Sequence, residues 1–302
     1  MRTAGLGALT KRNVKLYFKD KGMFFSSLIT PLILLVLYTT FLKNVFEDSF
    51  RGALDAAGAA VSDSIIGGCV GGQLVSSLLA VSCVTVAFCS NLLMVQDKIS
   101  GARRDLTVTP VHSGTLALSY YAASLLSTLI ISFAASAVCF AYLAAEGWYL
   151  STADVAAVIG DVILLCLFGT ALSSCVNFPL TTQGQASAVG TIVSAGYGFI
   201  CGAYMPISQF SDGLQKVLSF LPGTYGTSML RNHALRGVFE EMSDHGFPDQ
   251  VLESIRDSVD CNIYFYGDKV SIGNMYIILP ASIAILVALY VLMNVIKAKR
   301  EK

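Results

Sequence analysis

The chain contains little charge and none of the short motifs that mark common catalytic sites. Charged residues make up 13% and hydrophobic residues 54% of its 302 residues, whereas a soluble domain is about a quarter charged. It has no HExxH zinc motif, no GxSxG nucleophile turn and no glycine-rich loop followed by Lys-Ser or Lys-Thr. The histidines, His112, His233 and His245, are expected in loops without a second metal ligand at the usual spacing. We therefore expect no catalytic residue, metal or cofactor in this chain, which is not predicted to be an enzyme.

Long stretches of the sequence are nearly free of charge. Six of them reach the length of about 20 mostly apolar residues with which a helix crosses the hydrocarbon core of a bilayer: residues 24–42, 65–94, 116–143, 155–176, 186–205 and 272–296. In lipid a helix satisfies all its backbone hydrogen bonds within one segment. The sequence therefore predicts an all-α polytopic membrane protein with six transmembrane helices over residues 24–302.

The basic residues gather on one predicted side of the membrane. Thirteen of the 20 Lys and Arg residues lie in residues 1–23, in the loop 95–115 or after residue 296. Acidic residues prevail in the opposite loops, above all between residues 207 and 271. The positive-inside rule then predicts a multi-pass protein of the plasma membrane with both termini in the cytoplasm. Because a basic lead precedes the first apolar segment, we expect that segment to be retained as a span and not cleaved as a signal peptide.

Small residues recur within the apolar segments. Gly67 and Gly71, Gly68 and Gly72, and Gly198 and Gly202 are pairs spaced four residues apart, which lets helix backbones approach closely. We expect these pairs to pack helices within the chain, and a second copy of the chain to pack against it. Seven of the eight cysteines lie in apolar segments and only Cys261 in an outer loop, so no disulfide framework is expected.

Residues 1–23 are expected to form a connecting helix before the first span. Lys11, Arg12, Lys15 and Lys19 cluster on one arc of a helical wheel, and apolar residues occupy the rest. This pattern is typical of a helix in the inner headgroup layer, with its cations toward anionic lipid or a partner. The alternative is a positively charged flank that only fixes orientation.

The segment 206–271 is expected on the outer side. Pro206 ends the fifth apolar segment, a short helix is possible over 212–221, and Pro222-Gly223 separates it from a second short element over 225–235. Both pieces are too short to span, so they predict a broken hairpin that dips into the outer leaflet, where it must be buried or line a cavity. Residues 239–269 are expected to form an acidic cap, with a helix after Pro248 that turns Val251, Leu252, Ile255 and Val259 inward.

The charged loop 95–115 joins the second and third apolar segments. We expect a short helix over 97–106, in which Gly101 and Ala102 are small enough to seat against another surface. Arg103 and Arg104 can bind carboxylates of a partner through charge-assisted hydrogen bonds. The predicted partner-binding residues are Asp97, Lys98, Gly101, Ala102, Arg103, Arg104, Asp105 and Leu106. The alternative is a loop that is basic through topology alone.

Asp161 is the acidic residue deepest within a predicted span, about two turns from its outer end. An ionisable residue at such a depth is a candidate functional group. The alternative is a purely structural role, in which the carboxylate reaches the outer interface or accepts a hydrogen bond from a neighbouring hydroxyl.

Two stretches carry a resemblance to a known family. The inner loop, DKISGARRDLTVTPVHSGTLALSYY (97–121), and the outer hairpin, MPISQFSDGLQKVLSFLPGTYGTSMLR (205–231), resemble the corresponding motifs of ABC-2 type exporter permeases. The order of basic lead, six spans, charged inner loop and broken outer hairpin is similar over nearly the whole chain. The acidic segment 239–269 is longer than in the compact forms of this family.

The resemblance implies a division of labour between subunits. Two copies of a soluble ABC ATPase, which would hold ATP and Mg, would dock beneath two permease chains, as a homodimer. The coupling helix would fall on residues 97–106, the connecting helix on residues 4–22, and an outer gate on Pro206, Phe220, Pro222 and Tyr225. The substrate would be amphiphilic, drug-like or lipid-linked and exported, and drug resistance would be one such role. Membrane lipid is the other expected partner, and no nucleic acid is expected.

Two other functions fit parts of the sequence. A motor-free scaffold or sensor could recruit a partner through the same basic face. An ion-coupled secondary transporter would show internal repeats and charges near the membrane midplane, whereas this chain has no convincing repeat and only the off-centre Asp161.

Overall fold

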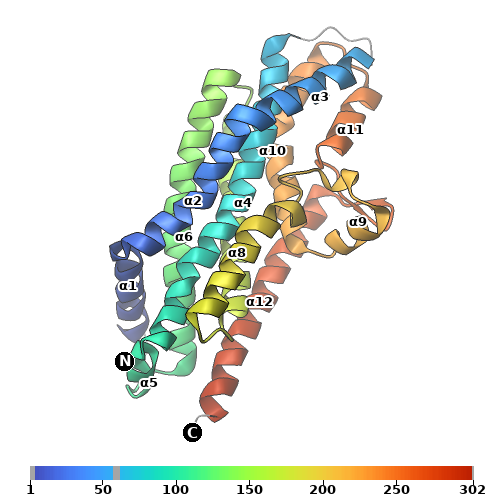
Figure 1. The fold of residues 1–302 in the computed structure, drawn as a ribbon. Helices are drawn as coiled ribbons and strands as arrows, with labels where there is room; N and C mark the ends of the chain where they lie inside the picture. The colour runs from blue at the N-terminus through green and yellow to red at the C-terminus, as the bar shows by residue number, and fades with distance from the viewer. Residues whose placement is uncertain (1–3, 57–61, 301–302) are drawn as a thin grey trace.

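Long apolar segments fold into helices that run along one axis. The structure, a computed structural model, describes residues 4–56 and 62–300, so the extreme ends of the two predicted domains (1–3 and 301–302) lie outside the described residues. Both ends of the described chain lie at one end of the bundle, together with the short helix α5 (Figure 1). We call this the inner end and the opposite one the outer end. The helices are α1 (Ala4–Lys19), α2 (Lys21–Leu37), the π-helical turn η1 (Tyr38–Leu42), α3 (Lys43–Ala56), α4 (Asp63–Ile99), α5 (Ala102–Thr107), α6 (Ser113–Glu146), α7 (Thr152–Asn177), α8 (Gln183–Ile200), the 3-10 turn η2 (Ile207–Gln209), α9 (Asp212–Leu218), α10 (Pro222–Asp244), α11 (Asp249–Ser258) and α12 (Ile272–Arg300).

Five helical segments of the described chain are long and apolar enough to cross a membrane: Lys21–Gly52, Asp63–Ile99, Ser113–Glu146, Thr152–Asn177 and Ile272–Lys299. They include five of the six predicted spans. The remaining one, the fifth predicted span over 186–205, corresponds to α8, which has 18 residues and ends at Ile200. At 1.5 Å per residue α8 is about 27 Å long, and its first turn carries Gln183 and Gln185. A multi-pass helical protein is confirmed, whereas the count of six spans is not.

Helix α4 forms the centre of the bundle and is buried along most of its length. Helices α2, α6, α7, α8 and α10 all contact it. Glycines on two faces of its outer part allow two neighbouring helices, α6 and α10, to approach closely. A Cβ on Gly67 would lie 3.0 Å from the Glu146 carbonyl oxygen of α6, and one on Gly72 would lie 3.0 Å from the Ala234 carbonyl oxygen of α10. The expected packing role of these glycines is therefore confirmed within the chain.

The outer segment differs from the expected hairpin. Helix α9 is short, as expected, but α10 continues for 23 residues to Asp244 instead of forming a second short element. Pro222 occupies the first position of α10, where its missing N–H is not needed. The first residues of the expected acidic cap, from Phe239, therefore belong to α10. Helix α11 begins after Pro248 and buries Leu252 and Ile255, which confirms the helix predicted there.

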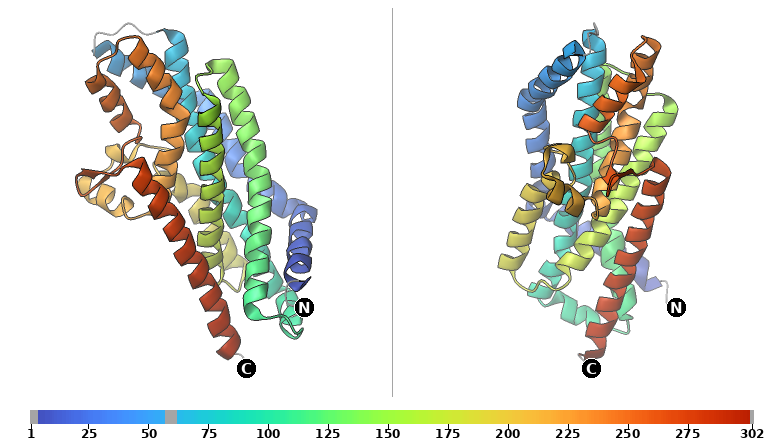
Figure 2. Two further views of the ribbon diagram at one scale, coloured as in Figure 1. Left: turned by 180° about the vertical axis from the view of Figure 1, so that it is seen from behind. Right: turned by 90° about the vertical axis from the view of Figure 1, so that its right-hand side faces the viewer.

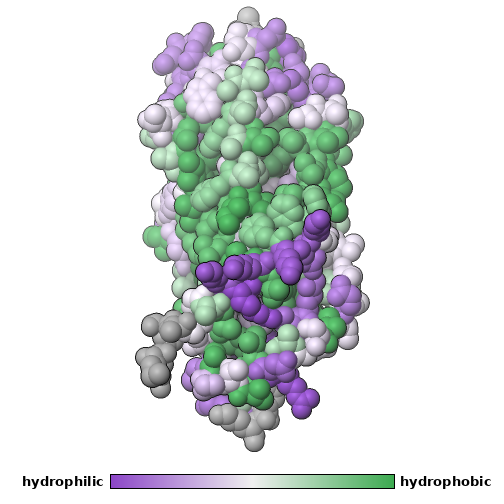
Figure 3. Space-filling view, turned by 90° about the vertical axis from the view of Figure 1, so that its left-hand side faces the viewer, coloured by the Kyte–Doolittle hydropathy of each residue, from purple (hydrophilic) through white to green (hydrophobic). Residues whose placement is uncertain are grey.

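A small hairpin, β1 (Tyr264–Phe265) with β2 (Asp268–Lys269), follows α11. The views in Figure 2 show this hairpin and α9 projecting from one side of the bundle, next to the start of α12. Figure 3 shows a different face, on the side of α1, where a broad hydrophobic surface lies between a hydrophilic band and the hydrophilic outer end. The five spans and this surface agree with a chain that is surrounded by lipid.

Candidate partner-binding site at the inner end

The inner end brings together α1, α5 and the ends of α4, α7 and α12. A single helix over 97–106 was the wrong expectation, because α4 continues to Ile99 and α5 begins only at Ala102. Between them Gly101 has a φ of +84°, a left-handed conformation that ends one helix and caps the next. The chain therefore turns sharply at Gly101, and α5 lies across the end of the bundle.

Asp97 links three helices at this turn. Its carboxylate forms an ion pair with Arg12 of α1, in which Nη2 lies 3.1 Å from Oδ1, and accepts a 2.6 Å hydrogen bond from the Tyr120 hydroxyl of α6. Its hydrogen bond and charge raise the pKa of Arg12 above its ordinary value. Asp97 is buried, so its contribution is internal to this chain: it fixes the connecting helix to the bundle.

Lys98 caps the C-terminal end of α7. Its ammonium donates hydrogen bonds to the carbonyl oxygens of Phe178 and Leu180, the latter at 3.0 Å. The last carbonyl groups of a helix have no partner within the helix, and a cation there also complements the helix dipole. Lys98 therefore stabilises the turn between α7 and α8.

The Phe178 ring lies beneath three cations. The distances to its centroid are 5.1 Å for Lys98 Nζ, 5.5 Å for Arg103 Cζ and 5.9 Å for Lys297 Nζ. Arg103 also donates a 2.9 Å hydrogen bond to the side-chain oxygen of Asn294 in α12. Arg103 was expected to point toward a partner, but here its guanidinium is turned inward and joins α5 to α12.

The outward face of α5 carries the remaining predicted residues. Arg104 and Asp105 are exposed, whereas Ala102 and Leu106 are half-buried. Val108, just beyond the helix, is 82% exposed. On α1 the cations Lys11, Lys15 and Lys19 are exposed, and Arg12 is half-buried against Asp97. The inner end thus offers a mixed charged and apolar surface, supported from behind by Asp97, Lys98 and Arg103.

The residues of the predicted outer gate occupy different environments. Tyr225 is buried and its hydroxyl donates a hydrogen bond to the Ser219 carbonyl oxygen. Phe220 is 60% exposed and packs edge-to-face on Phe265 of the small hairpin, with 5.2 Å between centroids. Pro206 lies buried in the turn after α8, and Pro222 begins α10. Only Phe220 therefore presents a large side chain at the surface.

A buried ion pair in the outer half of the bundle, at the level of Ser77 on α4, was missed by the sequence reasoning. Arg231 of α10 is 1% exposed, lies 3.2 Å from Asp260 and also donates to Ser77 of α4 and to the Gly202 carbonyl oxygen. Asp260 in turn accepts the backbone N–H groups of Ile207, at 2.6 Å, and Ser208. Burial raises the pKa of Asp260, and the charge of Arg231 opposes the rise. The pair ties α4, α10 and the turns after α8 and α11 together.

Asp161 is buried and has two side-chain partners. Its carboxylate lies 2.6 Å from His233 Nδ1 and accepts a 2.9 Å hydrogen bond from the Tyr276 hydroxyl. The hydroxyl partner fits the alternative of a structural role, but His233 was expected in a loop and instead lies within α10. Among the residues that the structure describes, no group of three or more His, Cys, Asp or Glu could hold a metal ion.

One comparison with known proteins identifies a family. The profile of the family described as ABC-2 type transporter matches residues 4–234, from α1 through most of α10. No significant match was found among curated proteins. The family match covers α5 and the outer turns but ends before α11 and α12.

Proposed function

Because the chain belongs to the ABC-2 type transporter family and is thus a multi-pass transport permease, we propose that it is the membrane subunit of an ATP-driven exporter. A separate ABC ATPase would bind ATP and Mg and dock on the inner end. Two ATPase copies and two permease copies, the latter as a homodimer, would form the complete exporter in the plasma membrane. This orientation places both termini in the cytoplasm, as the basic residues favour.

The observation that carries the proposal is the two-sided character of α5. Its outward side offers Arg104, Asp105 and Val108 to a partner. Its inward side is fixed to α12 by the hydrogen bond from Arg103 to Asn294. A force applied to the outward side would therefore reach α12 and, through the short turn at Gly101, the central helix α4.

Lys98 and Asp97 extend this connection to the other helices. Lys98 holds the end of α7, and Asp97 holds α1 and α6. Closure of the ATPase subunits on ATP would then move these helices as one body, in a rigid-body transition of the kind that interfaces transmit. The direction of movement, export, and an amphiphilic, drug-like or lipid-linked substrate belong to the proposal.

Charge reversal on the outward side of α5 tests the docking site. Arg104→Glu should lower the amount of ATPase subunit that co-purifies with this chain about ten-fold, because a rim charge pairs with opposite charge on the partner. Membrane insertion should stay unchanged, since Arg104 is exposed. Lys216→Glu, an exposed cation at the outer segment, is the matched control and should retain the ATPase.

The double change Arg103→Glu/Arg104→Glu should abolish transport and ATPase binding together. Arg103→Gln alone should keep the ATPase bound but reduce transport, because it weakens the contact to Asn294 and the Phe178 ring without changing the outward face. A chain that purifies with no ATPase, or an Arg104→Glu variant that transports normally, would contradict the proposed docking site.

A further inference from the structure

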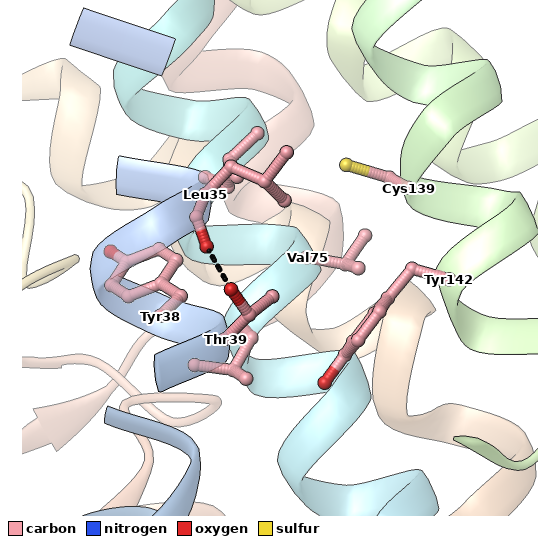
Figure 4. A pocket seen from close by; sticks show the side chains of 8 residues that line it. Leu35, Tyr38, Thr39, Val75, Cys139 and Tyr142 are labelled. Atoms are coloured by element: carbon pink, nitrogen blue, oxygen red, sulfur yellow. Dashed lines mark hydrogen bonds between the residues drawn. The ribbon is translucent and has the colours of Figure 1, made fainter. Parts of the chain in front are cut away.

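A groove lies between α2, α4 and α6, toward the outer end of the bundle. Figure 4 shows Leu35 and Thr39 on one wall, Val75 at the base, and Cys139 and Tyr142 on the other wall. The only hydrogen bond drawn there runs from the Thr39 hydroxyl to the Leu35 carbonyl oxygen, at 2.8 Å, within the helix itself. The side chains around the groove therefore present an almost wholly apolar surface.

Two local features open this groove. The π-helical turn η1 inserts an extra residue after α2, as such turns often do at functional sites. It turns Tyr38 inward, where its hydroxyl donates a 3.1 Å hydrogen bond to the Ala203 carbonyl oxygen, and leaves Thr39 exposed at the rim. On α4, Gly71 allows α6 to approach closely, since a Cβ there would lie 2.9 Å from Leu143. One turn closer to the inner end α4 carries Val75, and there the three helices leave the groove between them.

The surroundings of the groove face the hydrocarbon of a bilayer. Leu32 and Val36 on α2 and Val138 on α6 are more than half exposed, and all three lie within segments long and apolar enough to span. In a membrane such a groove is in contact with acyl chains. Its walls belong to two different spans, α2 and α6, so an acyl chain that lies along the groove would contact both.

A charged pair closes the outer end of the groove. Lys43 and Glu146 lie four residues beyond Thr39 and Tyr142, that is, about one helical turn farther out on each wall. Lys43 Nζ lies 2.6 Å and 2.7 Å from the two carboxylate oxygens of Glu146, and both side chains stay partly exposed. The apolar groove thus leads directly to one cation and one anion that lie just beyond the predicted apolar segments 24–42 and 116–143.

We propose that the groove binds one phosphatidylethanolamine molecule of the surrounding bilayer, with an acyl chain between α2 and α6 and its headgroup at Lys43 and Glu146. The headgroup would replace the contact between the two side chains: the lipid phosphate would pair with the Lys43 ammonium, and the lipid ammonium would donate to the Glu146 carboxylate. Phosphatidylcholine offers the same charges but no N–H donor, and phosphatidylglycerol has no cation for Glu146. The lipid site is independent of any ATPase partner.

Two exposed threonines offer a matched pair of variants. Thr39 lines the groove, whereas Thr40 does not, and both hydroxyls bond to carbonyl oxygens of the preceding turn. Thr39→Phe should fill the groove from its rim, and Thr40→Phe should add the same ring toward bulk lipid. Because both positions are exposed, both variants should fold, and equal unfolding temperatures would verify this.

The full chain would be reconstituted into nanodiscs that contain phosphatidylcholine and an equal amount of either phosphatidylethanolamine or phosphatidylglycerol. The reconstituted protein would then be washed with detergent. Mass spectrometry would count the lipids that stay bound. We expect about one phosphatidylethanolamine per chain in the wild type and in Thr40→Phe, and about ten-fold less in Thr39→Phe, a loss of one factor of ten in affinity. Glu146→Gln should abolish the preference over phosphatidylcholine.

Three results would overturn the proposal. The first is equal retention of phosphatidylethanolamine by Thr39→Phe and the wild type. The second is a disulfide between two chains carrying Thr39→Cys, which would mean that a second copy covers the groove. The third is a bound amphiphile that is released when ATP is added to the complete exporter, because that behaviour belongs to a transported substrate and not to a resident lipid.

Discussion

Two regions of the bundle, the inner end and the cluster around Arg231 in the outer half, hold their charges in different ways. In the outer half Arg231 and Asp260 form a pair that is almost completely buried and is surrounded by backbone donors and acceptors. At the inner end Lys98, Arg103 and Lys297 share one aromatic ring and neighbouring carbonyl or amide oxygens, and none of the three is fully buried. Buried charges fix an arrangement, whereas partly exposed ones can adjust to a partner.

The difference agrees with the roles proposed for the two regions. A docking surface has to bind a partner and transmit its movement. The partly exposed cations over the Phe178 ring can change position without being left in an apolar core, and this suits such a surface. The buried pair instead keeps the end of α8, the middle of α10 and the turn after α11 in one place. We therefore predict that the cluster around Arg231 is rigid and that the inner end is adaptable.

Removing Asp260 should produce the largest effect and tests the cluster around Arg231 directly. Asp260→Ala leaves the Arg231 guanidinium buried without its anion, and breaking a buried pair costs about 3–5 kcal/mol. Asp260→Asn keeps the shape and one acceptor, so it should cost less. The free energy of unfolding would be measured by SDS titration in mixed micelles, with Asp268→Ala in the exposed hairpin as the control. A loss below about 1 kcal/mol in Asp260→Ala would mean that this cluster is not fixed by its ion pair.

The next largest loss of stability is expected from Gly237→Ala, which creates a steric clash and changes no charge. A Cβ at this position of α10 would lie 1.8 Å from the Tyr149 carbonyl oxygen, so Gly237→Ala must push the loop before α7 away. Overpacking of this kind costs about 1–3 kcal/mol or more. Gly160→Ala in α7 is the control, because nothing lies within 4 Å of its Cβ and alanine is the better helix former. The same unfolding titration should show a loss for the first variant and none for the second.

The sequence predicted the helical class and most of the long helices because apolar segments without charge leave few alternatives in lipid. The glycine pairs at the start of α4 were also interpreted correctly as packing sites. The fifth predicted span, over 186–205, extended too far, because residues 201–205 form a turn in which Gly202 has a φ of +72°. The length of α10 was missed because Pro222 was taken as a break, although a proline can equally begin a helix.

The contacts of the site could be predicted only in part. The positions of Arg103 and Arg104 next to each other gave no sign that one side chain turns inward and the other outward; the left-handed turn at Gly101 decides this. Likewise, nothing local relates Arg231 to Asp260 or Asp161 to Tyr276, because these pairs are 29 and 115 residues apart. The available signal for a buried partner was that Arg231 directly follows the uncharged stretch 217–230.

Replacing the ring at the inner end should have the smallest effect and therefore tests whether this end is adaptable. Phe178→Leu keeps a buried apolar side chain but removes the face over which Lys98, Arg103 and Lys297 lie. Cation–π contacts contribute about 0.5–1 kcal/mol each at exposed sites, and cations that keep their carbonyl and amide partners retain part of their stabilisation. We expect Phe178→Leu to lower the free energy of unfolding by about 1 kcal/mol more than Phe88→Leu does. Phe88→Leu is the control for the loss of ring packing in the core. A loss as large as that of Asp260→Ala would mean that the inner end is as tightly fixed as the cluster around Arg231, and that α5 moves only together with the whole bundle.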